Sequence, residues 1–182
     1  MDSALMPKPE GHLHSLTHAE RCAAFGSFTF TPSPLPDNPE HVTIEPEWLR
    51  KNLTTVEVPQ IKRKVQFHRL AANDLLKLFA AWEDAGLLPL VLRFNGGFAS
   101  RFKRGTSDTS AKGLSNHAWG TAIDVNAKWN PLGKEPAALG QPGCVLPLVP
   151  VAERLGWAWG GYFSRKDGMH FERASVGILG EG

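Results

Sequence analysis

The chain has 182 residues, a length within the usual range of a single domain with one hydrophobic core. Its 20 lysine and arginine residues nearly balance 18 acidic residues, and the net charge of +2 is too small to indicate a nucleic-acid partner. The two cysteines exclude a disulfide-stapled scaffold and a thiolate zinc cluster, and they are typical of a reducing compartment. We therefore expect a monomeric globular protein that binds no nucleic acid.

The amino-terminal part of the chain is predicted to be an arm. Residues 1–47 contain seven of the fourteen prolines, which predicts irregular backbone with one short extended piece at 28–31. We expect this arm to pack on the core or to fray from it, and we place the folded domain proper at residues 48–182. Four irregularly spaced histidines of the arm are assigned solvated or packing roles: His12, His14, His18 and His41.

Neither a secretion signal nor a membrane span is predicted. The first seven residues lack a basic region followed by an apolar run, and no apolar stretch of the chain reaches transmembrane length. We expect synthesis in the cytoplasm. A substrate outside the cytoplasm would then be reached after lysis, through a pore made by a partner, or by dedicated export.

The remaining helices and strands are predicted without the regular alternation of a doubly wound fold. The clearest helix follows an apolar stripe from Ala71 to Trp82 at three- and four-residue spacing, and Gly86 is a natural stop. We expect this helix to back a small sheet, which makes the fold class α+β. Shorter helices are predicted at residues 46–50 and 150–156, and strands at 88–94, 121–125 and 168–171.

Two imidazoles and a carboxylate are predicted to form a split metal site. His117 lies in a turn before the strand at 121–125, and Asp124 on that strand can face a cleft. Gly120 supplies the bend that lets the imidazole fold back toward the carboxylate. The third ligand, His170, must come from an adjacent strand. Two histidines and one carboxylate are typical of catalytic zinc with a fourth position for water, whose pKa zinc lowers to roughly 7.

Two further carboxylates flank the last ligand and compete for the role of general base. Asp167 precedes His170 by three residues, a spacing that brings the two side chains together in a turn, and Gly168 permits such a turn. Its carboxylate could then pass a proton to a leaving amine. Glu172 shares a strand face with His170, so it is either the base or a residue that orients the ligand histidine. Spacing alone leaves both roles open.

Two sequence blocks resemble the signature of a known enzyme family. They read Ser115-x-His117-x-x-Gly120-x-Ala122-x-Asp124 and Asp167-x-x-His170-x-Glu172, and they are similar to the zinc D,D-carboxypeptidase and L-alanyl-D-glutamate endopeptidase family, peptidase family M15, which includes phage endolysins and VanY-like enzymes. The resemblance runs from about residue 70 to residue 172. It implies one zinc-peptidase domain of the D-alanyl-D-alanine carboxypeptidase or hedgehog-like type, with a small antiparallel sheet backed by helices.

The resemblance also implies roles for individual residues. It places a single zinc ion on His117, Asp124 and His170, and it favours Asp167 over Glu172 as the base.

Three residues outside this core set receive expectations from the same resemblance. Arg101 is expected to reach the cleft, where it would stabilise an oxyanion or hold a substrate carboxylate. A surface arginine is the alternative, because Lys103 and Arg104 are also basic. Ser115 is expected either to bind substrate or to fix the loop of His117, and Trp159 to form a cleft wall on which a peptide lies.

The implied activity is zinc-dependent hydrolysis of peptide bonds in the stem peptides of bacterial peptidoglycan. An L-alanyl-D-glutamate-type endopeptidase or endolysin, acting on the cell wall, is the favoured form. A D-alanyl-D-alanine carboxypeptidase or dipeptidase is one alternative, and a non-catalytic zinc module that binds wall fragments or a protein partner is another. The expected partner of the enzyme is a peptidoglycan peptide.

Overall fold

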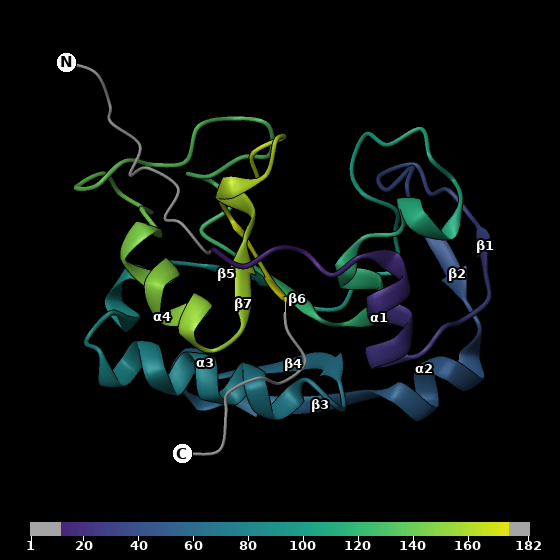
Figure 1. Ribbon diagram of the computed structural model, residues 1–182, viewed down its shortest axis with the longest axis horizontal. Coiled ribbons are helices and arrows are strands. Elements are labelled where there is room, and N and C mark those ends of the chain that lie inside the picture. Colours follow the sequence, from purple (N-terminus) through teal and green to yellow (C-terminus); the bar gives the residue numbers. More distant parts are fainter. Residues whose placement is uncertain (1–11, 175–182) are drawn as a thin grey trace.

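The fold was examined in a computed structural model that describes residues 12–174 (Figure 1). Helices and antiparallel strands are mixed, so the predicted α+β class is confirmed. In chain order the elements are α1 (His18–Phe25), β1 (Phe30–Pro32), β2 (Val42–Ile44), α2 (Pro46–Asn52), β3 (Leu53–Val58), β4 (Arg63–His68), α3 (Ala72–Asp84), β5 (Phe94–Gly96), β6 (Ala122–Val125), α4 (Val149–Arg154), β7 (Trp157–Trp159) and β8 (His170–Arg173). Short 3-10 turns lie between them, among them η2 (Leu88–Leu90), η4 (Asn116–Trp119) and η6 (Gly160–Tyr162).

A four-stranded antiparallel sheet carries the centre of the molecule. Its strand order is β5-β6-β8-β7, so the two strands expected to carry metal ligands, β6 and β8, are direct neighbours. Their register pairs Asp124 with His170 and Ala122 with Glu172. Side chains of paired residues lie on the same face of a sheet. The register therefore places a predicted ligand on each strand, side by side.

Helix α3 packs its apolar stripe beneath this sheet, as predicted. Leu75, Leu78, Phe79 and Trp82 are fully buried, and burial of each such side chain contributes about 1.5–3 kcal/mol. The indole of Trp82 lies 5.6 Å, between ring centroids, from Phe171 of β8, in an edge-to-face arrangement. The helix thus supports the strand that carries His170 from below.

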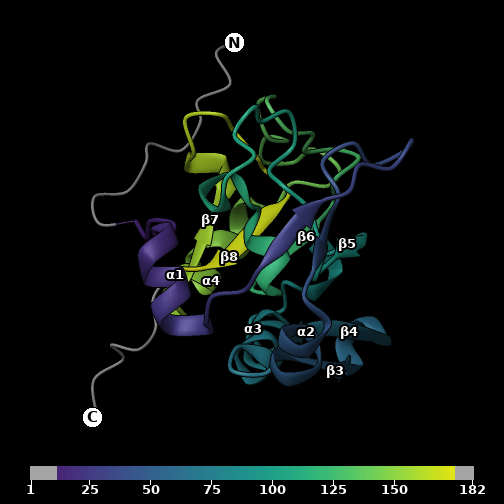
Figure 2. The same cartoon turned by 90° about the vertical axis from the view of Figure 1, so that its right-hand side faces the viewer.

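The described part of the predicted arm is folded and packed on the core. Helix α1 begins with a capping box, in which the side chain of Thr17 accepts from the backbone of Glu20 and the side chain of Glu20 accepts from the backbone of Thr17. Phe25 at its end is buried. The expectation of irregular backbone is therefore wrong for residues 18–25, because this local capping outweighs the surrounding prolines. Figure 2 shows α1 beside β8, on the flank of the central sheet.

The predicted boundary between the arm and the domain crosses a helix and a ring contact. The division between residues 47 and 48 falls inside α2, and Trp48 of that helix lies 4.5 Å, between ring centroids, from Phe28 of the arm. The division into an arm and a domain stays a prediction.

The first seven residues, on which the expectation of no secretion signal rests, lie outside the described residues. None of the helices within residues 12–174 is long and apolar enough to cross a membrane.

The strand predicted at residues 88–94 is wrong over most of its length. Residues 88–90 form the 3-10 turn η2, and only Phe94 joins a strand, at the start of β5. Pro89 explains the difference, because it lacks the N–H that a ladder needs and its fixed φ favours a turn. The hairpin of β3 and β4, with six paired positions, was not predicted, nor was β7.

Candidate metal centre

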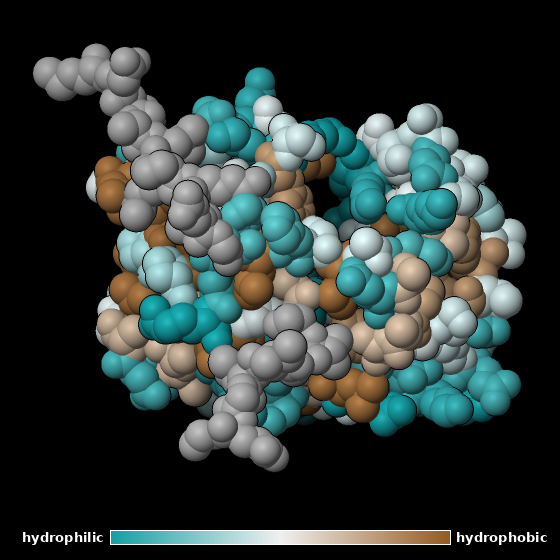
Figure 3. Space-filling view, viewed as in Figure 1, coloured by the Kyte–Doolittle hydropathy of each residue, from teal (hydrophilic) through white to brown (hydrophobic). Residues whose placement is uncertain are grey.

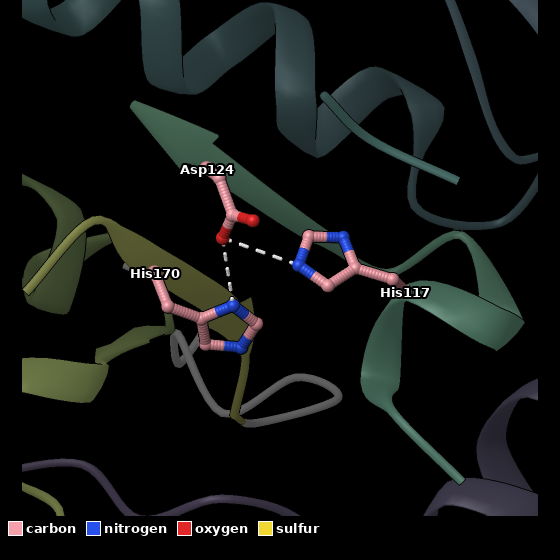
Figure 4. A group of neighbouring side chains, drawn as sticks. All are labelled: His117, Asp124 and His170. Carbon is pink, nitrogen blue, oxygen red and sulfur yellow. Dashed lines mark hydrogen bonds and ion pairs between the residues drawn. The ribbon is translucent and has the colours of Figure 1, made fainter. Parts of the chain in front are cut away.

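Asp124 and His170 face each other because their strands are in register. One carboxylate oxygen of Asp124, Oδ1, lies 3.0 Å from Nδ1 of His170. The same oxygen lies 3.2 Å from Nε2 of His117. The three side chains point toward one another (Figure 4). Their donor atoms all lie within 4.8 Å of one another.

A tight turn brings His117 back to the start of β6. Ser115 caps the turn η4, and its hydroxyl accepts a hydrogen bond from the backbone N–H of His117 at 3.3 Å. Gly120 closes the turn with φ +68°, and a Cβ there would lie 2.9 Å from the backbone nitrogen of His68. Only glycine satisfies both the positive φ and the close approach. Of the two roles expected for Ser115, the geometry supports fixing the loop.

Each imidazole is held by the nitrogen that faces away from Asp124. Nδ1 of His117 donates to the carbonyl of Gly97 at 2.6 Å. Nε2 of His170 donates to Oε2 of Glu172 at 2.8 Å. Such outer hydrogen bonds set the tautomer and the ring orientation of metal-ligating histidines. They leave Nε2 of His117 and Nδ1 of His170 as acceptors that face the shared space.

The pKa values of the cluster show strong coupling in the metal-free protein. Burial by itself would lower the pKa of His170, but its hydrogen bonds to Asp124 and Glu172 raise that pKa to about 10. Burial also opposes ionisation of Asp124, yet His117 and His170 hold the pKa of its carboxyl far below the usual range. A cation is therefore favoured between these groups. A divalent ion would replace the proton that the cluster otherwise holds.

The donor set fits zinc. Two imidazole nitrogens and one carboxylate oxygen, with both imidazoles anchored from behind, match the chemistry of a three-ligand zinc centre. Within residues 12–174, no fourth histidine, cysteine or acidic side chain belongs to this group. A coordination position would remain for water or substrate.

Asp167 lies beside the three donors in a tight turn. Its backbone carbonyl accepts from the N–H of His170 at 3.0 Å, and its own N–H donates to the carbonyl of Gly160 at 2.9 Å. A Cβ at Gly160 would lie 2.5 Å from the carbonyl oxygen of Asp167, so glycine permits this approach. Burial raises the pKa of the Asp167 carboxyl. Its Oδ1 is buried and has no hydrogen-bond partner among the described residues.

Glu172 lies behind His170, at the buried edge of the site. It is 3% exposed, and its Oε2 also accepts from the side-chain amide of Asn116. The charge of Arg21, on α1, acts on the same carboxylate. This arrangement fits the orienting role that the sequence left open for Glu172, because its Oε2 holds the imidazole of His170 from behind.

Arg101 reaches the same cavity from the loop after β5. It is half-buried, it forms an isolated bridge with His41, and its Nη1 donates to the carbonyl of Phe102 at 3.2 Å. Its charge acts on both Asp124 and Asp167. The alternative of an exposed surface arginine does not describe this position.

A cavity of about 1110 Å³ opens over these groups. It is bounded on one side by residues 15–21, including the start of α1, and on another by the loop of residues 101–115. Figure 3 shows the molecule hollowed at this place. The cavity contacts all three metal donors together with Asp167 and Arg101.

Trp159 is placed differently from the expectation of a cleft wall. Its side chain is 1% exposed and is not among the described residues that line the cavity. Its indole N–H donates to the carbonyl of Gly168 at 2.8 Å. The expectation is therefore wrong in this structure, because Trp159 lies under the turn that carries Asp167 and supports it.

Three contributors to the site were missed in the sequence. The carbonyl of Gly97 and the amide of Asn116 are hydrogen-bond partners of His117 and Glu172, respectively. Asn116 lies inside the first motif block and Gly97 well before it, and at neither position did the residue type suggest chemistry. Arg21 could have been found only through the capping box that predicts its helix.

Comparison with known proteins agrees with this geometry. Residues 109–173 match the family model described as D-alanyl-D-alanine carboxypeptidase. The match supports an M15-family zinc peptidase. It contains the three metal donors with Asp167 and Glu172, whereas Arg101 lies before its first residue. No curated protein matches the chain.

Proposed function

We propose that the protein is a zinc-dependent peptidase that hydrolyses amide bonds in the stem peptides of bacterial peptidoglycan. The observation that carries the proposal is the convergence of three donors, two of them imidazoles anchored from behind, in a cavity that also holds a carboxyl group of raised pKa. The family match supports peptidase chemistry. The amide-bearing stem peptide is the substrate that this family resemblance favours.

His117, Asp124 and His170 would hold the ion. Zinc bound there would supply a Lewis acid for the amide carbonyl and would acidify a water molecule.

The chain's own groups would divide the remaining work. Asp167 would accept a proton from the attacking water and return it to the leaving amine, a task suited to a carboxyl of raised pKa. Arg101 would stabilise the negative charge on the former carbonyl oxygen or hold a substrate carboxylate. Glu172 would keep His170 in the tautomer that presents Nδ1.

An endopeptidase of the L-alanyl-D-glutamate type is the favoured form. The cavity of about 1110 Å³ has room for more than a dipeptide, which argues against a dipeptidase, although a carboxypeptidase that acts on a whole stem peptide needs the same space. The description of the matched family favours the alternative, a D-alanyl-D-alanine carboxypeptidase or dipeptidase. A non-catalytic zinc module is less well supported, because a structural zinc site usually recruits a fourth protein ligand.

The wider setting follows from the same proposal. The peptidase would be one domain of the D-alanyl-D-alanine carboxypeptidase or hedgehog-like type, and it would act as a monomer on the cell wall after release or export.

Digestion of purified peptidoglycan tests the function. The zinc-loaded protein is compared with its Asp167→Ala variant, and the products are identified by mass. New amine termini without free D-alanine would identify an endopeptidase, and free D-alanine would identify the carboxypeptidase. Absence of products from both proteins, with one equivalent of zinc bound, would contradict the proposed activity and favour the binding module.

A further inference from the structure

Lysines and arginines outnumber acids in the lining of the cavity, and four of these cations are exposed, whereas the acids lie at the floor beside the three donors. Asp124, Asp167 and Glu172 are the acidic residues among the described residues that line it. Two of them, Asp124 and Glu172, are hydrogen-bonded to the imidazole of His170. The lining lysines and arginines are Arg21, Arg101, Lys103, Arg104, Lys112 and Arg165. The whole chain has a net charge of only +2, so this excess of positive charge is local.

The loop after β5 places two lysines next to Arg101. Its two arms are joined by a bridge between Phe102 and Leu114, by the hydrogen bond from Lys103 N–H to the carbonyl of Gly113 at 2.9 Å, and by that from Ser115 N–H to the carbonyl of Arg101 at 3.1 Å. Bridged backbone alternates its side chains. Phe102 is accordingly buried in the core, while Arg101 and Lys103 line the cavity.

The second lysine lies on the opposite arm of this loop. Nζ of Lys103 donates to the backbone carbonyl of Lys112 at 3.3 Å. Both lysines also act electrostatically on His18, which lines the cavity from α1. The two ammonium groups therefore belong to the same mouth of the cavity, between α1 and the loop. In Figure 3 hydrophilic side chains gather along one edge of the hollow.

Neither lysine is neutralised by an ion pair within residues 12–174. Arg104 differs, because its guanidinium is paired with Glu40 at 2.6 Å. Asp108 in the same loop feels the charge of both lysines, but its carboxylate accepts from the backbone of Ser110 at 2.9 Å and forms no ion pair with either lysine. Binding of a divalent cation at the floor would offset the acids there and leave the mouth more positive still.

We infer that Lys103 and Lys112 form a subsite for a free carboxylate of the substrate peptide, separate from the group held by Arg101. The inference rests on the proposed function. Residues two apart in extended backbone are separated by about 7 Å, so Lys103 lies about two peptide residues outward from Arg101. A second carboxylate that the peptide carries near its scissile amide would lie at this distance from the group held by Arg101. The subsite thereby selects acidic peptides over neutral ones.

Three synthetic pentapeptides test the subsite with the full-length, zinc-loaded protein. The first is L-alanyl-γ-D-glutamyl-L-lysyl-D-alanyl-D-alanine with both carboxyl groups free. The second has the glutamyl α-carboxyl as a carboxamide, and the third has the C-terminal carboxyl as a carboxamide. Cleavage by the wild type is compared with that by Lys103→Gln/Lys112→Gln. The matched control is Lys64→Gln/Lys77→Gln, which removes the same charge from exposed positions outside the cavity lining.

The expected result is a selective change in KM. On the free peptide, Lys103→Gln/Lys112→Gln should raise KM by roughly five- to tenfold with kcat retained, as the loss of charged contacts to substrate predicts. On one of the two carboxamides the same variant should match the wild type within about twofold. The control variant should behave as the wild type on all three peptides.

Three results would overturn the subsite. If KM rises equally on all three peptides, or if the variant matches the wild type on the peptides and on peptidoglycan, the lysines do not bind a carboxylate, although the peptidase activity stands. If the variant matches the wild type on the peptides but is slower on whole peptidoglycan, the lysines bind an anionic wall polymer instead. Failure of the wild type to cleave any peptide or peptidoglycan would overturn the proposed function and this subsite with it.

Discussion

His68 and His170 are both buried histidines, but their surroundings differ in charge. His68 is 0% exposed, its Nε2 donates to the carbonyl of Phe25 at 3.0 Å, and its Nδ1 accepts from the N–H of Leu70 at 3.2 Å. His170 is 6% exposed, and its two nitrogens contact the carboxylates of Asp124 and Glu172. Burial is similar, whereas the partners are neutral in one case and anionic in the other.

The consequence is an opposite response to protons. Burial lowers the pKa of His68 to about 4, while the carboxylates overcome burial and raise the pKa of His170 to about 10. A buried histidine among neutral groups excludes positive charge, and one between carboxylates attracts it. The comparison teaches that carboxylate partners, and not burial, distinguish the proposed metal ligand His170 from His68.

Removal of a ligand should give the largest effect. His117→Ala leaves two donors and an uncompensated carboxylate at Asp124, so the zinc content should fall from about one equivalent to near zero and peptidase activity should be lost. Zinc is measured by elemental analysis after gel filtration. His68→Gln is the matched control, since it changes a histidine equally buried but without carboxylates, and it should keep its zinc. Zinc loss in the control alone would reverse the comparison.

The next effect should come from the carboxyl group that lies beside the donors. Asp167→Asn keeps the shape of the side chain but removes proton transfer, so kcat should fall by roughly a hundred- to ten-thousandfold. Zinc content should stay at that of the wild type. The same measurements on Glu172→Gln serve as the comparison. If Glu172→Gln lost kcat to this extent while Asp167→Asn stayed fully active, the assignment of the base would be wrong.

The part of the site within one short segment could be predicted from the sequence. The contact between two segments far apart in the chain could not be derived from it. His117, Gly120 and Asp124 lie within eight residues, so turn chemistry and strand alternation suffice to place them together. The contact of Asp124 with His170 depends on the register of β6 and β8, which spacing along the chain does not specify. The family resemblance supplied that link.

Errors arose where tertiary contacts or a proline outweighed a local pattern. Pro89 ended the strand expected at 88–94. Trp159 was expected in a cleft wall, but strand alternation does not say which face of β7 is covered, and both are buried. Helix α3 was predicted well because its apolar stripe is long and periodic.

A smaller effect is expected when the support of a ligand, but not the ligand, is changed. Glu172→Gln removes the charge of the carboxylate that accepts a hydrogen bond from Nε2 of His170. The zinc affinity should therefore weaken by about ten- to a hundredfold. The affinity is measured by competition with a chelator of known strength. Activity should return at saturating zinc, which a change at Asp167 would not allow. An unchanged affinity would mean that the hydrogen bond from His170 to Glu172 has no part in metal binding.

The smallest effect should appear in stability at mildly acidic pH. The pKa of His68 is about 4 in the folded protein, against 6.5 for the ordinary side chain. Between these values the unfolded chain binds more protons, so the free energy of unfolding should fall as the pH falls through this window. The contribution of His68 is fully present above about pH 6.5, and about 2 kcal/mol of it should be lost by pH 5.

Urea unfolding of the metal-free protein at a series of pH values measures this loss. His68→Gln keeps a donor for the carbonyl of Phe25 and has no group that titrates in this range, so its free energy of unfolding should depend less on pH than that of the wild type. All other titratable groups are the same in both proteins, and the difference between the two pH profiles therefore isolates His68. Parallel profiles would show that His68 can be protonated in the folded state at no cost, and the contrast with His170 would not hold.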